Sequence, residues 1–276
     1  MQTAPLTAAE VRRYLAVLGV ERAAPGVTAL RRLVRAQLLR IPFETVSKLW
    51  YLRRHDLRDV PDLDLYLDGI RRYRFGGTCY SNNLHFWRLL RALGYDATLC
   101  GADMPAGHDV HAAIAIGAGG REWLVDAGNA APFLVPLPLD LDRPHEVRWG
   151  DSCWLLRPRD GEGRSSVEVW HHGEHVHGYT LKPGQVAPET FDRVVRDSFR
   201  PQATFMNAVL LVRCHPRRLV RILNLEVTRA TRTRSSTAAL AGRDAFVAAV
   251  EREIGIPARI TAAAIAGIER FGGVYG

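Results

Sequence analysis

The sequence of 276 residues contains few cysteines and no long apolar run. The four cysteines form no CxxC pair, which argues against a disulfide framework and against a structural zinc site. We therefore expect a reducing, cytoplasmic location. No stretch approaches the ~20 apolar residues of a membrane-spanning helix, and glutamate and arginine interrupt the apolar pattern of the first twenty residues, unlike in a secretory leader. We expect no membrane partner.

Signs of nucleic-acid binding are also missing. Lys and Arg number 37 against 29 Asp and Glu, but the basic residues are spread along the chain. No helix-turn-helix, zinc-finger or aromatic-basic RNA-binding signature is present, so we expect no nucleic-acid partner. Most of the basic residues are arginine, which binds phosphate and carboxylate groups in a planar fork. The charge balance therefore favours an anionic ligand or an acidic protein partner.

The first third of the sequence has the pattern of packed helices. A capping box at Thr7 begins a helix that ends at Gly19, and a second helix is predicted over residues 27–39. The stretch RIPFET, residues 40–45, breaks the helical pattern and brings Phe43 inward from a loop. The sequence thus predicts a helical region before the first strand.

The remainder of the sequence changes to strands and then to a mixture. Residues 95–179 form short alternating runs that predict an antiparallel sheet, in the form of a small barrel. The pattern predicts a connecting helix over residues 189–199 and a pair of strands over 207–215 and 219–229. It also predicts an amphipathic helix over residues 242–255. No internal repeat or low-complexity linker separates these parts, so we expect them to pack as one unit.

Cys79 is a candidate nucleophile in the stretch FGGTCYSNN, residues 75–83. It lies seven residues before Phe86 on the inward face of a predicted helix, at its first turn. The partial positive charge of a helix N-terminus favours a thiolate there. Gly76 and Gly77 would let another chain or a substrate approach the backbone closely. The alternative is an ordinary cysteine that fills the core.

A histidine and an aspartate supply the partners that such a thiol needs. If Ala118 and Gly119 form a two-residue hairpin loop, His111 and Asp126 lie directly opposite each other on one face. The carboxylate could then fix the imidazole tautomer and leave the other ring nitrogen for the thiol. These residues predict a thiol, a general base and an orienting carboxylate in one site.

Other groupings remain open. His108 is a rival base, with Asn129 as its hairpin partner in a Cys-His-Asn arrangement. The stretch HHGEHVHG, residues 171–178, is interpreted as a solvated hairpin, and we expect no metal site. The basic stretch RRYR, residues 71–74, is typical of a solvated surface, with phosphate binding as the alternative.

Taken together, these stretches resemble the arylamine N-acetyltransferases. RIPFET resembles the family's IPFEN element, and FGGTCYSNN resembles its RGGxCxExN nucleophile motif. His111 with the following AAIAI, and WLVDAG, resemble the histidine and aspartate strands. RPQATF and RILNLEVTR are similar to parts of the third domain, so the resemblance covers essentially the whole chain.

The resemblance implies an α+β fold: an N-terminal helical bundle, a central antiparallel β-barrel and a C-terminal α/β lid. It also implies a cysteine-protease-like triad of Cys79, His111 and Asp126. The expected domains are a helical domain with the nucleophile at 1–95, a barrel with His and Asp at 96–190, and the connecting helix and lid at 191–276.

The resemblance implies ping-pong acyl transfer from a thioester to a small-molecule amine, with no bound cofactor. The donor would be an acyl-CoA or an acyl-carrier-protein thioester. The expected substrate-binding residues are Phe43, Asn129, Thr204 and Phe205. Thr204 and Phe205 are included because they lie in the segment that contacts coenzyme A in the family.

The sequence also departs from the family pattern. Phe75 replaces an arginine that pairs with the family glutamate, so Glu44 needs another partner, for which Arg74 or Arg40 could serve. Ser81 replaces a glutamate or glutamine, and Asn129-Ala130 replaces Phe-Gly in the acceptor pocket. We interpret the chain as a divergent member, with an amide synthase-like relative among the options. A cysteine hydrolase with the same triad and a non-catalytic binding protein are the alternatives.

Overall fold

Five helices occupy the first third of the chain in the computed structural model, which describes residues 4–273. They are α1 (Ala8–Leu18), α2 (Val27–Arg40), α3 (Val46–His55), α4 (Leu63–Tyr73) and α5 (Cys79–Ala92). Thr7 caps α1 through the expected capping box, and Gly19 ends it in a left-handed conformation. Both local signals in the sequence are therefore confirmed.

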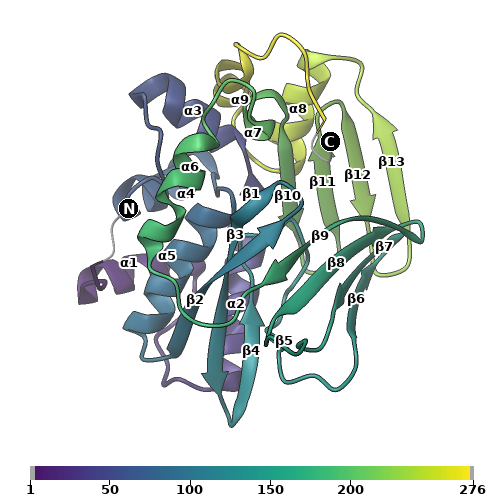
Figure 1. Cartoon of the computed structure of the whole chain (residues 1–276). Helices are drawn as coiled ribbons and strands as arrows, with labels where there is room; N and C mark the ends of the chain where they lie inside the picture. Colours follow the sequence, from purple (N-terminus) through teal and green to yellow (C-terminus); the bar gives the residue numbers. More distant parts are fainter. Residues whose placement is uncertain (1–3, 274–276) are drawn as a thin grey trace.

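The central part is one antiparallel sheet of eight strands, in the order β5-β4-β3-β2-β9-β8-β7-β6. The strands are β2 (Asp96–Met104), β3 (Gly107–Ala118), β4 (Arg121–Val125), β5 (Leu137–Pro138), β6 (His145–Trp149), β7 (Ser152–Leu156), β8 (Ser165–His171) and β9 (Glu174–Leu181). The sheet curls strongly (Figure 1), but within residues 4–273 no strand pairing joins its edge strands β5 and β6. It is a nearly closed barrel.

The turn between β3 and β4 differs from the prediction by one residue. Gly119 and Gly120 form the two-residue loop, and Ala118 pairs with Arg121. Both glycines have positive φ, +61° and +72°, as a type I′ turn requires, whereas an alanine at the first loop position would be strained. His111 and Asp126 are consequently not directly opposite. The offset is two residues, which keeps both side chains on one face of the sheet.

A second sheet of five strands has the order β1-β10-β11-β12-β13. Its strands are β1 (Phe43–Glu44), β10 (Leu210–Cys214), β11 (Leu219–Leu223), β12 (Glu226–Ala230) and β13 (Ser235–Ala239). Phe43 pairs with Val212, so the prediction that it lies in a loop is wrong. Residues 219–229 are also two strands rather than one, because Asn224 adopts a positive φ of 51° and turns the chain.

The connecting segment and the C-terminal helices complete the fold. The elements are η1 (Pro188–Phe191), α6 (Asp192–Asp197), α7 (Thr204–Asn207), α8 (Arg243–Glu253) and α9 (Ala258–Ile265). The connecting helix and the late amphipathic helix confirm the sequence prediction. The connecting segment runs across the N-terminal helices (Figure 1). The expected domain boundaries stay a prediction.

Phe75 belongs to a second hydrophobic cluster between α3, the five-stranded sheet and the C-terminal helices. Its ring is 1% exposed and meets the Tyr51 ring edge-on, with 5.6 Å between centroids. Cluster members also come from α8 and α9, including Phe246 and Ile260. An aromatic side chain thus fills the position at which the family that this sequence resembles has an arginine. Within residues 4–273 no helix is both long and apolar enough to cross a membrane.

Candidate active site

Cys79 is the first residue of α5 and is buried, with 9% of its surface exposed. The chain reaches it through a tight approach between two backbones. A Cβ on Gly76 would lie 1.9 Å from the Pro42 carbonyl oxygen, and Gly77 forms a parallel bridge with Phe43. Only glycine fits this contact at position 76, and the segment that approaches it closely is residues 42–43 of the same chain.

His111 on β3 lies beside Asp126, which directly follows β4. Nε2 of His111 is 2.9 Å from Oδ2 of Asp126, and both residues are buried. Burial alone would lower the pKa of His111, but the charge and hydrogen bond of Asp126 outweigh it. Interaction with the Cys79 side chain raises the pKa further, so that it reaches about 10. The structure therefore brings the three predicted residues together.

Asp126 accepts hydrogen bonds on both carboxylate oxygens. Oδ1 accepts from Nδ2 of Asn83 at 2.8 Å and from the Gly128 backbone at 3.3 Å. Oδ2 accepts from His111 and from the Tyr179 hydroxyl, the latter at 2.9 Å. Burial raises the pKa of this carboxyl, but His111, Asn83 and Tyr179 more than offset that effect, and the net pKa is lowered. Asp126 is therefore held as a carboxylate.

Asn83 has a part in the site that the sequence analysis missed. It is fully buried on α5, and its Oδ1 accepts from the backbone N–H groups of Ala127 and Gly128, at 2.8 and 3.2 Å. Its Nδ2 also donates to the Ala112 carbonyl at 2.5 Å. One side chain thus ties the nucleophile helix to the histidine strand and to the loop after Asp126. Its presence in FGGTCYSNN, four residues after Cys79, was the available signal.

Tyr179 and Gly128 were missed as well. The Tyr179 ring on β9 packs against the His111 ring at 4.6 Å between centroids, in addition to its hydrogen bond with Asp126. A Cβ on Gly128 would lie 2.5 Å from Cα of Cys79. The aspartate loop therefore lies directly on the backbone of the nucleophile helix.

The other cysteines lie in environments that favour the thiol. Burial raises the pKa of Cys100 to about 11 and that of Cys214 to about 12, and it also raises the pKa of Cys153. Among the cysteines, only Cys79 interacts with a histidine whose pKa is raised in turn.

The expected substrate-binding residues lie on three separate elements. The rings of Phe43 on β1 and Phe205 on α7 meet edge-on, with 6.1 Å between centroids. Thr204 is exposed on the same short helix as Phe205. Asn129 is half-buried in the loop after Asp126, and its Nδ2 is buried with no hydrogen-bond partner among residues 4–273. The Asn129 side chain thus holds a buried amide donor that has no partner among the described residues.

Two sequence predictions about the surroundings of the site are wrong. The His108 side chain is 87% exposed, and its Nδ1 is bonded to Asp103 at 2.9 Å rather than placed beside Asn129. Glu44 pairs with neither Arg40 nor Arg74 within the described part of the chain. Its oxygens instead accept from the backbone N–H groups of Ser47 and Gly76, at 2.8 and 3.0 Å, and burial raises its pKa.

Comparison with known proteins identifies the class. The family model for N-acetyltransferases matches residues 26–262. The chain therefore belongs to the N-acetyltransferase family and is an N-acyltransferase enzyme, which confirms the resemblance seen in the sequence.

Individual relatives agree with this assignment. Proansamycin X synthase from Amycolatopsis mediterranei is 28% identical over 192 residues, covering 64% of this chain and 69% of the relative. The arylamine N-acetyltransferase of Nocardia farcinica has a TM-score of 0.76 at 24% identity, over 93% of both chains. The Mycobacterium marinum enzyme in complex with CoA has a TM-score of 0.76 at 20% identity, over 94% of this chain and 99% of that one. These solved structures share the fold.

Proposed function

We propose that the protein transfers an acyl group from a thioester to an amine through an acyl-Cys79 intermediate, with His111 as the general base and Asp126 as its orienting carboxylate. The observation that carries this proposal is the hydrogen-bonded Asp126. Its Oδ2 holds Nε2 of His111 as a donor, which leaves Nδ1 to exchange a proton with the Cys79 thiol.

The reaction would run in two half-reactions. The Cys79 thiolate attacks the thioester carbonyl, the bond to the donor sulfur breaks, and the leaving thiolate takes a proton from His111. The amine then attacks the acyl-cysteine and His111 removes its proton, so that Cys79 departs as a thiolate and an amide is formed. Each half-reaction returns His111 to the state that the next one needs.

The donor is a thioester carried on CoA or on an acyl carrier protein. The CoA complex of the Mycobacterium marinum relative supports the first source. The formal net charge of +8 suits either the phosphates of CoA or the acidic surface of a carrier protein. The likeness to proansamycin X synthase supports a natural-product synthase that uses a larger acyl group.

The acceptor is an amine that is bulkier or more polar than a simple aniline. Asn129 places an unpartnered buried amide where the resembling family has an aromatic wall. A site with a buried polar group discriminates against ligands that leave this group unpaired. The Phe43 and Phe205 rings, which contact each other edge-on, would supply an apolar surface for the acceptor.

Intact-mass spectrometry of the full chain tests the proposal. After incubation with acyl-CoA and acyl-carrier-protein thioesters, we expect a mass increase of one acyl group on Cys79, absent in Cys79→Ala, that an added amine discharges as amide. Discharge by water at the same rate without amine would indicate the hydrolase instead. Acylation by the carrier-bound donor should slow as salt rises, while acylation by a small pantetheine thioester should not. Efficient turnover of acetyl-CoA, with carrier-bound donors no better at any salt concentration, would indicate an ordinary acetyltransferase instead.

A further inference from the structure

Lys48 on α3 is half-buried, and its ammonium group has no carboxylate partner within residues 4–273. Its Nζ donates to the Ser198 carbonyl at 2.6 Å and to the Ser198 hydroxyl at 2.9 Å. It also lies 4.4 Å from the centre of the Phe199 ring. Within residues 4–273 Lys48 makes no ion pair with an aspartate or glutamate. Removing an ammonium from water is unfavourable unless an anion compensates, so this position favours a negative charge nearby.

The ammonium shares a small cavity, of about 30 Å³, with the start of α5. The cavity is lined on that side by Gly77, Thr78, Tyr80 and Ser81, the residues that flank Cys79 in the sequence. The other titratable groups in its lining are Tyr51 and Asp59. Lys48 and the residues on both sides of Cys79 therefore border the same small cavity, although Cys79 itself is not among its lining residues.

We propose that Lys48 is a positioning residue that stabilises the Cys79 thiolate across this cavity. The proposal rests on the proposed function, in which Cys79 is the nucleophile. Interaction with the Cys79 side chain also favours the charged form of His111, whereas it disfavours ionisation of Tyr80 and raises the pKa of Tyr80. Lys48 supplies a second positive charge, from α3, in addition to the imidazolium on β3.

The electrostatics of Lys48 support this pairing. Burial lowers the pKa of Lys48 to about 8, and the charge of Cys79 is what opposes that effect. Coupling between two titrating groups is reciprocal, so a thiolate that favours the ammonium is favoured by it to the same extent. A Lys48 ammonium and a Cys79 thiolate would therefore stabilise each other.

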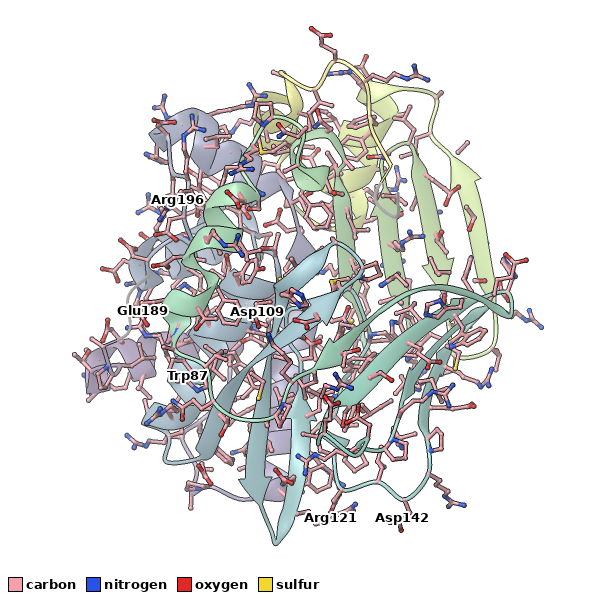
Figure 2. The ribbon with its side chains drawn as sticks, viewed as in Figure 1. Trp87, Asp109, Arg121, Asp142, Glu189 and Arg196 are labelled. Atoms are coloured by element: carbon pink, nitrogen blue, oxygen red, sulfur yellow. The ribbon has the colours of Figure 1, made fainter. Side chains whose placement is uncertain are left out.

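The structural alternative is a strap that holds the connecting segment against α3. Figure 2 shows this segment, which carries Glu189 and Arg196, across the N-terminal helices. The Tyr80 and Phe191 rings also hold the segment, with 5.4 Å between centroids. A strap depends on the hydrogen bonds with Ser198, whereas thiolate stabilisation depends on the charge of Lys48. The two roles therefore respond differently to substitution.

The test is the pH profile of Cys79 alkylation by iodoacetamide in the full chain, read by peptide mapping. In Lys48→Met and Lys48→Gln we expect the pH of half-maximal rate to rise by on the order of one unit, because a nearby positive charge is lost. Lys48→Arg keeps the charge and should restore the profile. Ser198→Ala is the matched control, which weakens the strap and should leave the profile unchanged. Circular dichroism checks the fold, and Lys48→Gln preserves a donor for Ser198 if Lys48→Met is unstable.

Unshifted profiles in folded Lys48→Met and Lys48→Gln would overturn the role of Lys48 and leave the proposed function standing. An equal shift in Ser198→Ala would also overturn it in favour of the strap. Preferential labelling of another cysteine in the wild-type protein would instead remove the nucleophile assignment, and this proposal with it.

Discussion

Asp126→Asn is the substitution whose effect the structure defines most closely. The two atoms of the new amide face different partners. Among residues 4–273 the partners of Oδ1 are both donors, Nδ2 of Asn83 and the Gly128 backbone N–H. The amide oxygen must therefore stay on that side, since a nitrogen there would face two donors.

Asn83 cannot turn over to relieve this constraint. Its oxygen already accepts from Ala127 and Gly128, and its nitrogen already donates to the Ala112 carbonyl. The new amide nitrogen must then face His111 and Tyr179. The Tyr179 hydroxyl can rotate and accept, but His111 can accept only with its proton moved to Nδ1, the nitrogen that should receive the proton of the thiol.

The expected result is a folded protein with the wrong imidazole tautomer. Acylation should slow by about 10⁴-fold, the loss seen when a triad aspartate becomes an amide, which corresponds to about 5 kcal/mol of barrier. Single-turnover acylation followed by intact mass measures this loss. Acylation within about tenfold of wild type, in a protein with a native circular dichroism spectrum, would refute the reasoning.

The same substitution has a signature in the pH dependence of stability. The pKa of His111 is raised from its ordinary 6.5 to about 10, so its stabilising contribution is fully present below pH 6.5 and is lost as pH rises to about 10. Removing the carboxylate removes that contribution. The wild-type advantage in free energy of unfolding over Asp126→Asn should thus shrink between pH 6.5 and 10. A difference independent of pH, measured by urea unfolding, would contradict this linkage.

Two further substitutions probe the loop after Asp126. Gly128→Ala should destabilise the protein by about 1–3 kcal/mol and slow acylation, because its Cβ would meet Cα of Cys79 at 2.5 Å; urea unfolding measures the first effect, and an unchanged midpoint would show that the loop is free to move. Asn129→Phe should shift amine selectivity toward simple arylamines, because it removes the unpartnered amide donor and adds an aromatic wall. Competition between aniline and a polar amine measures this shift, and efficient use of aniline by the wild-type protein with no change in the variant would refute it.

Local signals in the sequence predicted those parts of the fold and of the site that depend on neighbours along the chain. The capping box at Thr7 and the approach allowed by Gly76 are of this kind. The hairpin prediction was displaced by one position, yet His111 and Asp126 still meet, because a shift of two in the pairing register preserves the face of each side chain.

Long-range partners were beyond the reach of such signals. Tyr179 reaches Asp126 from 53 residues away, and its strand carries no motif that marks this contact. A backbone partner for Glu44 was not foreseen either. We expected an arginine because a buried carboxylate needs compensation, but two N–H groups supply it, one of them on Gly76. The donor that a backbone offers depends on packing, which residue types alone do not specify.

The two-residue strand β1 has a consequence for the modularity of the enzyme. Phe43 and Glu44 belong to the N-terminal region by sequence, but they form the edge of the C-terminal sheet through β10. The Thr45 hydroxyl oxygen accepts a further hydrogen bond from the Leu210 N–H at 3.2 Å, and Gly77 forms a β-bridge with Phe43. The loop that leads into Cys79 is thereby joined to the sheet of the last third of the chain. A chimera that exchanges the C-terminal third with that of a relative would therefore separate β10 from its native partner β1, which contacts the nucleophile loop through Gly77. Residues 41–46 would have to be exchanged together with the C-terminal third.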